Sequence, residues 1–358
     1  MRHEQRIDKT RAELPGIGVD ALLVTNLTNV RYLTGFSGTN GQVLVWDDGA
    51  LFCTDPRYAA RAADLVEGAE VAVYRDKLTD LLPERLGSIA ATRVGIEAET
   101  VTVAQRDRFA AALEGIELVS TSGLLEGQRR SKDDDEIAAV RRAVEYGDAA
   151  FNWILDRIKP GRTEAEIALD LEVHMRNEGA DDVSFEPIVG SGPLSAHIHH
   201  TPSDRQVQRG DFVLLDFGSL KDGYHSDLTR TVVVGTATDE QRQMYDLVLR
   251  AQAAGIDAVR AGAEGTVVDS AARELITGAG YANEFGHGLG HGVGLDIHEA
   301  PRLARTSQDE LVEGDVVTVE PGIYRVGWGG IRIEDCVLVT KEGAETLGNA
   351  PKSALLEV

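Results

Sequence analysis

The feature that most constrains the fold is a repeated pattern in the C-terminal half, in which a strand-like apolar run ends on an acidic residue. The segment RGDFVLLDFG, which contains Asp216, matches the later segment EGDVVTVEPG, which contains Glu320. A second strand in each half has an acidic residue near its start, Asp227 in the first and Glu334 in the second. Similar halves of this kind usually pack about a pseudo-two-fold axis. That symmetry predicts that Asp216 lies beside Glu320, and Asp227 beside Glu334.

Four acidic residues in apolar, β-branched runs indicate a metal site. Such residues are costly to bury unless they are paired or bound to a metal. Four carboxylates that converge on one point cannot all stay ionised without a counter-cation. Two divalent ions that share bridging carboxylates would satisfy this condition.

A glycine-rich loop, GHGLGHGVG, contains His287 and His291, and His298 follows shortly after it. A His-x3-His pair usually suggests two zinc ligands on one helical face, but five glycines in nine residues disfavour a helix. Such a loop instead lets the backbone come close to a ligand. The histidines therefore need not share one role.

A second histidine cluster, His197, His199 and His200, lies upstream of the first acidic strand. The three side chains could form a metal cluster of their own, or one could contact substrate while the other two are bystanders. We favour the second interpretation. His199 and His298 occupy loosely similar places, each preceding an acidic strand in its own half.

The chain is expected to form two domains, residues 1–125 and 126–358. Alternating strand and helix signals in the first predict an α/β layer domain, and residues 123–132 are expected to be a linker. A long helix is predicted from about Asp133 to Lys159. The other predicted elements of the first domain are strands at 20–24, 42–46, 69–74, 93–96 and 117–119 and helices near 3–14, 56–66, 77–87 and 103–113.

Composition narrows the range of partners. The formal net charge of −23 argues against nucleic acid, and the two distant cysteines suit a reducing compartment. The charged start lacks an apolar signal core, and no apolar stretch approaches membrane-spanning length. These features predict a cytoplasmic protein with no nucleic-acid or membrane partner.

The C-terminal half resembles the pita-bread metallopeptidases: aminopeptidase P, prolidase (Xaa-Pro dipeptidase) and methionine aminopeptidase. The matching segments are LDFG, SDLTRT, GHGLGHGVGLDIH, VEPG and GIRIED, in that order. The N-terminal half resembles the creatinase-type N-domain, and its segments GFSGTNG and TDPRY look more like aminopeptidase P than archaeal prolidase. The resemblance implies an α+β pita-bread domain with an internal pseudo-two-fold repeat, preceded by an α/β creatinase-type domain, and a homodimer.

The resemblance also assigns roles to individual residues. It implies that five residues are metal ligands: Asp216, Asp227, His291, Glu320 and Glu334. It implies that His199, His287 and His298 contact the substrate and the transition state, and that Arg332 supports the site near Glu334. Two departures from the family pattern are Pro56, where glycine is frequent, and His200, where small residues are common.

The ligand set predicts the cofactor and the chemistry. Four carboxylates and one imidazole form an oxygen-rich site that favours Mn(II), with Co(II) and Zn(II) as alternatives. Two such ions would activate a water for attack on the scissile carbonyl, and Glu320 would pass a proton to the leaving proline nitrogen.

The expected substrate is a proline-containing peptide, because a tertiary Xaa-Pro amide resists general peptidases. The glycine-rich segment 35–41 is poorly suited to block the site beyond the proline, which favours aminopeptidase P activity on longer peptides. Prolidase activity on dipeptides is the alternative. Arg57 is a candidate partner for the dipeptide carboxylate, and a structural role beside Asp55 is an equally good interpretation of Arg57. A metal-free creatinase-like hydrolase and a non-catalytic binding protein are disfavoured, because every ligand position is filled.

Overall fold

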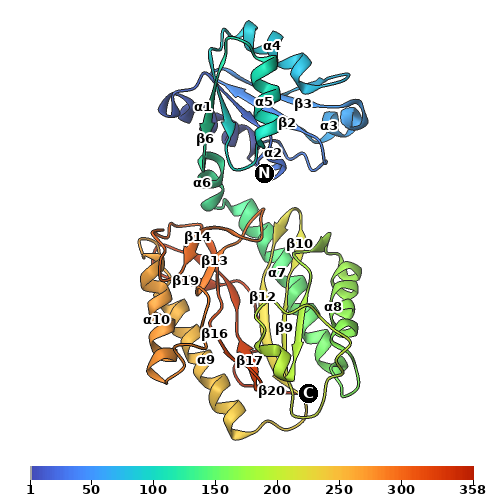
Figure 1. Ribbon diagram of the computed structural model, residues 1–358, viewed down its shortest axis with the longest axis vertical. Helices are drawn as coiled ribbons and strands as arrows, with labels where there is room; N and C mark the ends of the chain where they lie inside the picture. The colour runs from blue at the N-terminus through green and yellow to red at the C-terminus, as the bar shows by residue number, and fades with distance from the viewer. Residues whose placement is uncertain (1) are drawn as a thin grey trace. The chain divides into compact units, whose positions relative to one another are not determined.

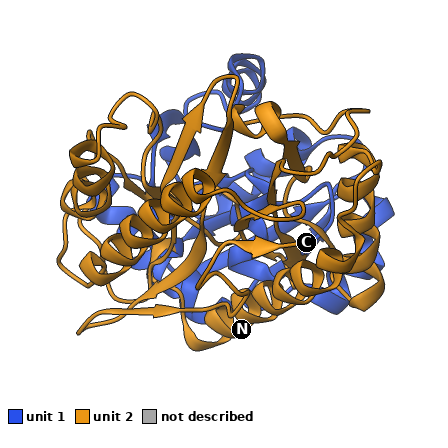
Figure 2. Ribbon diagram, turned by 90° about the horizontal axis from the view of Figure 1, so that it is seen from below, with its two compact units in different colours: residues 1–129 blue, residues 130–358 orange. Residues whose placement is uncertain are grey.

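The computed structural model describes residues 2–358 and divides into two compact units, residues up to 129 and residues 130–358. Figure 2 gives each unit its own colour. No helix within the described residues is both long enough and apolar enough to cross a membrane.

The N-terminal unit is built on a six-stranded mixed sheet in the order β4-β3-β2-β1-β5-β6 (Figure 1). Strand β1 pairs antiparallel with β2 and parallel with β5. All four residues of β1 are buried, as expected for a strand covered on both faces. The strands are β1 (Ala21–Val24), β2 (Gln42–Trp46), β3 (Gly49–Thr54), β4 (Glu70–Val73), β5 (Arg93–Glu97) and β6 (Glu117–Thr121). The helices are α1 (His3–Ile17), α2 (Leu27–Thr34), η1 (Pro56–Tyr58), α3 (Ala59–Leu65), α4 (Leu78–Ser88) and α5 (Val103–Ala112).

Two elements of this unit, α2 and β3, were not predicted. Helix α2 begins at a capping residue, Asn26, whose side chain accepts a hydrogen bond from the Thr28 amide, and it ends at Gly35 in the left-handed conformation. Strand β3 follows β2 after a tight turn, and every residue of β2 pairs with a residue of β3. Both are short elements whose ends are set by turn chemistry.

The segment predicted as the linker, residues 123–132, contains the boundary between the two units, and its residues Leu124–Arg130 form helix α6. Leu125 and Arg129 are both 2% exposed. Arg129 donates a hydrogen bond to the side chain of Asn29 (2.8 Å), and Asn29 donates to Glu126 (2.7 Å). Buried contacts with α2 therefore order the N-terminal side of this segment.

The long helix predicted at the start of the C-terminal unit is α7 (Asp134–Ile154), which Asp133 and Glu136 cap reciprocally. It ends earlier than expected, and a 3-10 turn, η2 (Leu155–Arg157), follows it. Pro160 limits how far the helix could continue, but it lies six residues beyond Ile154 and does not itself end α7 there.

The C-terminal unit, including α7, consists of two halves with the same order of elements, two helices followed by strands (Figure 1). The first half contains α7, α8 (Glu164–Glu178), β7 (Asp182–Val183), β8 (Ile188–Ser191), η3 (Gly192–Ala196), β9 (Phe212–Phe217), β10 (Ser219–Lys221), β11 (Tyr224–His225) and β12 (Leu228–Val233). The second contains α9 (Asp239–Ala258), α10 (Gly265–Gly278), β13 (Gly290–Gly292), β14 (Glu299–Leu303), β15 (Val316–Val319), β16 (Gly322–Arg325), β17 (Gly329–Arg332), β18 (Asp335–Val339) and β19 (Ala344–Thr346), and β20 (Leu356–Glu357) returns to pair with β12.

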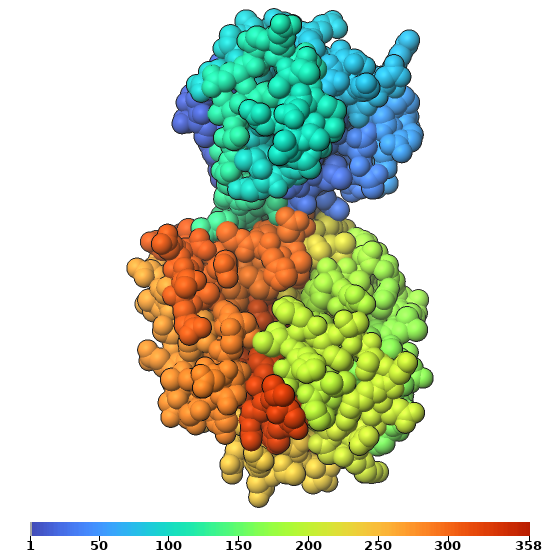
Figure 3. Space-filling model, in the orientation of Figure 1, coloured from blue at the N-terminus to red at the C-terminus, as the bar shows by residue number. Residues whose placement is uncertain are grey.

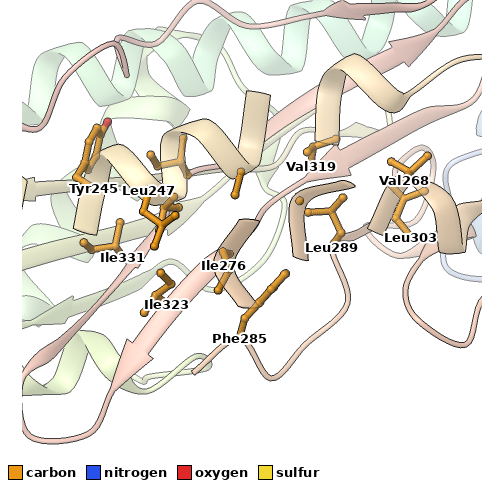
Figure 4. Close-up of a cluster of buried hydrophobic side chains, with 14 of the residues drawn as sticks. Tyr245, Leu247, Val268, Ile276, Phe285, Leu289, Leu303, Val319, Ile323 and Ile331 are labelled. Atoms are coloured by element: carbon orange, nitrogen blue, oxygen red, sulfur yellow. The ribbon is translucent and has the colours of Figure 1, made fainter. Parts of the chain in front are cut away.

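Each half has its own sheet and its own apolar core. The sheet orders are β20-β12-β9-β8 and β14-β13-β15-β18-β19. Phe151 of α7 and Leu171 of α8 belong to a core cluster with β9 and β12. Val248 of α9 and Val268 of α10 belong to a second cluster with β15 and β18, part of which Figure 4 shows. On the face seen in Figure 3, the yellow-green first half and the orange second half lie on either side of a red C-terminal segment.

A buried arginine joins the two sheets. Arg230 of β12 is 1% exposed and forms an ion pair with Asp335 of β18 at 2.7 Å. Its guanidinium also donates to three backbone carbonyls, those of Thr229 (3.0 Å), Ala350 (2.9 Å) and Glu334. Because Glu334 is one of the predicted metal ligands, this arginine stabilises the backbone of the predicted metal site through the Glu334 carbonyl.

We expect Arg230→Met to destabilise the C-terminal unit by about 3–5 kcal/mol, because it breaks a buried ion pair, leaving Asp335 with Lys352 as its cationic partner, and removes the donor to three backbone carbonyls. Arg141→Met is the matched control, since Arg141 and its partner Glu345 are 36% and 50% exposed, and exposed pairs contribute only about 0–1 kcal/mol. Thermal unfolding of both variants checks this. Equal losses in the two variants would contradict the role given to Arg230.

Candidate metal centre

The strand ends bring the four acidic residues together. In the antiparallel ladder of β9 and β12, Asp216 lies opposite Thr229, and Asp227 directly precedes β12. Glu320 directly follows β15, and Glu334 lies between β17 and β18. The Glu334 amide donates to the Thr229 carbonyl (3.1 Å), so the acid-bearing segments of the two halves meet at this point.

The predicted fifth ligand, His291, lies on the short strand β13. Its neighbour Gly290 is required there, because a Cβ atom at that position would lie 2.0 Å from the carbonyl oxygen of Thr318. The close approach lets the His291 amide donate to the Thr318 hydroxyl (3.1 Å), which in turn donates to Glu320 (3.3 Å). The glycine-rich segment thus fixes a histidine next to the acid of the adjacent strand.

Helix α10 holds the loop that precedes His291. Arg273 donates to the carbonyls of Phe285 (2.9 Å) and His287 (2.6 Å), and its guanidinium is fixed by Asp269 of the same helix. Asp269 also accepts from the Leu289 amide (3.0 Å). A loop rich in glycine is therefore ordered by an ion pair on the neighbouring helix.

Ligand atoms of Asp227, His291 and Glu334 all lie within 4.8 Å of one another, and within residues 2–358 this is the group of at least three such residues that could hold a metal ion. The Nε2 atom of His291 lies 3.6 Å from Asp227 Oδ2 and 3.6 Å from Glu320 Oε1. Asp216, the remaining acidic residue, forms an ion pair with Arg332 through its Oδ2 atom. The two halves therefore contribute donors to one small volume, in the way that the repeat predicts.

The protonation of His291 suits a metal ligand. Its Nδ1 atom lies 3.0 Å from the carbonyl oxygen of Gly292, which can only accept a hydrogen bond. The proton is therefore on Nδ1, and Nε2 directs a lone pair towards the carboxylates. Burial lowers the pKa of His291 to about 4, so the ring is neutral at pH 7.

The carboxylates themselves resist ionisation. Burial and the charges of Glu334, Asp216 and Glu320 raise the pKa of Asp227 well above its usual value. Burial, together with the charges of Glu320 and Asp216, does the same to the pKa of Glu334. Burial raises the pKa of Glu320 from 4.5 to about 8 despite the opposing charge of Arg332, and the charge of Asp216 adds to the rise. A bound divalent cation would offset the charge of these carboxylates.

Two orphaned atoms support the same conclusion. Among the described residues, the buried Oδ1 atoms of Asp216 and Asp227 have no hydrogen-bond partner, and a buried polar atom of this kind needs a partner. Together with the bare Nε2 of His291, these atoms form a hard, oxygen-rich donor set that fits divalent ions.

A polar network beside the donors includes two residues that the sequence analysis missed. Arg332 donates to the Tyr324 hydroxyl (2.7 Å) and the Thr229 hydroxyl (3.0 Å), and Thr229 donates to Glu334 (2.6 Å). Arg332 therefore contacts Asp216 directly and Glu334 through Thr229. A signal for Thr229 was present in the sequence: it lies two residues after Asp227, on the same face of the strand.

The three histidines expected to contact substrate differ in their environments. His298 is exposed, and its ring stacks edge-on against that of His291 at 4.4 Å between centroids. His287 is largely buried: its Nδ1 lies 2.7 Å from the Gly288 carbonyl oxygen, and its Nε2 lies 2.9 Å from the Tyr324 hydroxyl. His199 is exposed. Burial and then His199 lower the pKa of His298, whereas the pKa of His287 is lowered by burial and the charges of Arg332 and Arg273, with His199 the smallest contribution. All three lie around the donor cluster.

The neighbours of His199 have other contacts. The rings of His197 and His200 are 5.9 Å apart, and His200 bonds to Glu164 (2.8 Å). These contacts favour the interpretation that only His199 of the three faces the site. Arg57, in the N-terminal unit, is bound by Asp55 through both carboxylate oxygens (3.0 and 2.7 Å).

Comparison with known proteins identifies the family. Residues 138–341 match the model of metallopeptidase family M24, and residues 6–131 match the creatinase/prolidase N-terminal domain. The chain belongs to metallopeptidase family M24. The expected fold is thereby confirmed: a creatinase-type N-terminal domain precedes a pita-bread domain. Membership of this metallopeptidase family implies divalent metal ions.

Individual M24 relatives cover almost the whole chain. An Xaa-Pro dipeptidase of Pyrococcus furiosus is 34% identical over 98% of this chain and 100% of its own length. The solved structure of an Xaa-Pro dipeptidase from Bacillus anthracis is 40% identical, covers 100% of both chains and superposes with a TM-score of 0.97. An X-Pro aminopeptidase from Thermotoga maritima is 36% identical, covers 97% of this chain and 100% of its own, and has a TM-score of 0.91.

The raised carboxylate pKa values predict how the metal-free M24 protein responds to pH. Glu320 ionises near pH 4.5 when the chain is unfolded but near pH 8 when it is folded, so its stabilising effect is lost as pH rises through this window. The free energy of unfolding of the chelated wild type, relative to chelated Glu320→Gln, should fall between pH 5 and 8. Taking this difference cancels the contributions of titratable groups that do not interact with Glu320.

Thermal unfolding of the two chelated proteins across this pH range checks the prediction. Added Mn(II) should stabilise the wild type most at the alkaline end, where the carboxylates are ionised. A difference between wild type and variant that does not change with pH would contradict the assigned burial of charge at Glu320.

Proposed function

We propose that this M24 protein hydrolyses Xaa-Pro dipeptides with the help of two divalent ions, Mn(II) being the best candidate. The observation that carries the proposal is the convergence of four acidic residues and one neutral histidine from two repeated halves. The whole-length similarity to proteins named Xaa-Pro dipeptidases supports a dipeptide substrate. It supports this substrate better than the longer peptides favoured from the sequence.

Five residues would hold the ions: Asp216, Asp227, His291, Glu320 and Glu334. Divalent ions in such a site polarise a carbonyl and lower the pKa of water, which is the chemistry that hydrolysis of a tertiary amide requires. Arg332 keeps Asp216 in place through a buried ion pair, and Thr229 fixes one oxygen of Glu334. The protein thus orients its donors before substrate arrives.

Hydrolysis requires a group that accepts a proton from the attacking water and passes it to the proline nitrogen. Glu320 lies beside His291 in the donor cluster, and its carboxylate would pass this proton to the departing proline nitrogen. The exposed rings of His298 and His199 are available to contact the peptide. His287 is neutral, since burial and the charge of Arg332 lower its pKa to about 3.

Aminopeptidase P activity on longer peptides is the second candidate. The similarity to the Thermotoga maritima protein named X-Pro aminopeptidase favours it. Restriction to dipeptides would require a group that blocks the site beyond proline or captures its carboxylate. The bidentate contact of Arg57 with Asp55 makes Arg57 a weaker candidate for that capture than its charge alone suggested.

A comparison of Ala-Pro with Ala-Pro-Ala at matched Mn(II) loading distinguishes the two candidates. We expect kcat/KM to be at least about tenfold higher for Ala-Pro, a difference of about 1.4 kcal/mol in transition-state binding. Ala-Ala serves as the control and should be cleaved poorly. A higher kcat/KM for Ala-Pro-Ala would replace the dipeptidase proposal by aminopeptidase P, and equal cleavage of Ala-Ala would overturn the requirement for proline.

A further inference from the structure

The turn that carries His199 is exposed, although the proposed function requires its ring to be held in place. Residues 197–200 form a turn closed by a hydrogen bond from the His200 amide to the His197 carbonyl (3.1 Å). The side chain of His199 itself is exposed. Its position therefore depends on how the residues on either side of it are anchored.

The anchor on the C-terminal side is Glu164, the first residue of α8, whose side chain is 0% exposed. Its Oε1 accepts from the amide (2.7 Å) and the hydroxyl (2.6 Å) of Ser191. Its Oε2 accepts from His200 Nε2 (2.8 Å) and from the amide (3.1 Å) and hydroxyl (2.6 Å) of Ser203. One buried carboxylate thus gathers three separate points of the chain around the turn.

The anchor on the N-terminal side connects the turn to the other half of the unit. The hydroxyl of Ser195 accepts a hydrogen bond from the Gly330 amide (2.8 Å) and donates to the Gly192 carbonyl (2.6 Å). Gly330 lies on β17, the strand that ends at Arg332. The turn is therefore held between α8 and the strand that carries the arginine of the donor cluster.

The second half has a similar arrangement behind His298. Glu299, the residue that follows His298, forms an ion pair with Lys132 at 3.2 Å, and the two side chains are only 6% and 1% exposed. Glu299 also accepts from the Asp296 amide (3.0 Å). In both halves, the residue after an exposed histidine is bound to a buried polar partner, which makes a chance contact at His200 a poor explanation.

We propose that Glu164 and His200 are positioning residues: the buried hydrogen bond between them holds the turn so that His199 faces the substrate. This inference rests on the proposed function, in which His199 contacts the peptide. It assigns a role to His200, whose ring stands where small residues are common in the family. Among the described residues, Glu164 and His200 contact Ser191, Ser203 and His197 rather than the metal donors, so the pair would act through His199.

The test is a double-mutant cycle between His200 and His199. His200→Phe keeps a ring of similar size but removes the N–H donor, and His200→Ala removes the ring altogether. His200→Gln is the matched control, since its side-chain amide can still donate to Glu164. Each change is made in the wild type and in His199→Ala, and kcat/KM for Ala-Pro is measured together with thermal unfolding and bound Mn(II).

We expect His200→Phe and His200→Ala to lower kcat/KM at least about tenfold in the wild type, because a misplacement of about 1 Å can cost about 100-fold. His200→Gln should stay within about threefold of wild type, and bound Mn(II) should be unchanged throughout. In the His199→Ala background the same changes should have almost no further effect, because coupled residues are not additive.

Equal losses in both backgrounds would overturn the proposal, because they would show a general structural effect that does not act through His199. Wild-type rates in His199→Ala alone would also overturn it, since the hydrogen bond between Glu164 and His200 would then have no catalytically important side chain to position. Hydrolysis of Ala-Pro by the wild type would leave the proposed function standing in either case. Failure of the wild type to cleave any Xaa-Pro peptide would instead overturn the proposed function, and this inference with it.

Discussion

The burial of several carboxylates in one small volume is the constraint on which the rest of the C-terminal unit depends. Burial and mutual repulsion hold the pKa values of Asp227, Glu320 and Glu334 above their usual range. An isolated cluster of this kind would oppose folding at neutral pH. The surrounding polar residues act against this cost: Arg332 binds Asp216, and Arg230 holds the backbone behind Glu334. Divalent ions supply the remaining positive charge.

The duplication explains how so many acids reach one place. Each half has its own sheet and apolar core, so each can hold one pair of acid-bearing strands rigidly. The acids lie at strand ends or next to them, where the two halves meet, and the ladder between β9 and β12 sets Asp216 opposite Thr229. The exposed histidines are supported in a related way, His199 by the contact of its neighbour with Glu164 and His298 by the contact of its neighbour with Lys132. Rigid sheets position the donors, and anchored turns position the groups around them.

The acid cluster was predictable because an acidic residue inside an apolar run has few explanations, and the repeat specifies which acids correspond. Tyr324, Thr229 and Glu164 were not predicted, because a polar residue in a strand or at a helix start is usually unremarkable until its partners are known. The same holds for the segment after residue 123: it was predicted as a linker, but its helix and the buried contact of Arg129 with Asn29 were not predicted. Contacts between residues distant in sequence leave little trace in local composition.

The measurement that tests the central claim most directly is the number of divalent ions bound per chain. The protein is stripped with a chelator, equilibrated with Mn(II) and analysed for bound metal, with Asp227→Ala treated in parallel. The account predicts about two ions per wild-type chain, fewer in Asp227→Ala, and peptidase activity that appears only as metal binds. Full activity in a chain shown to contain no divalent metal would contradict it.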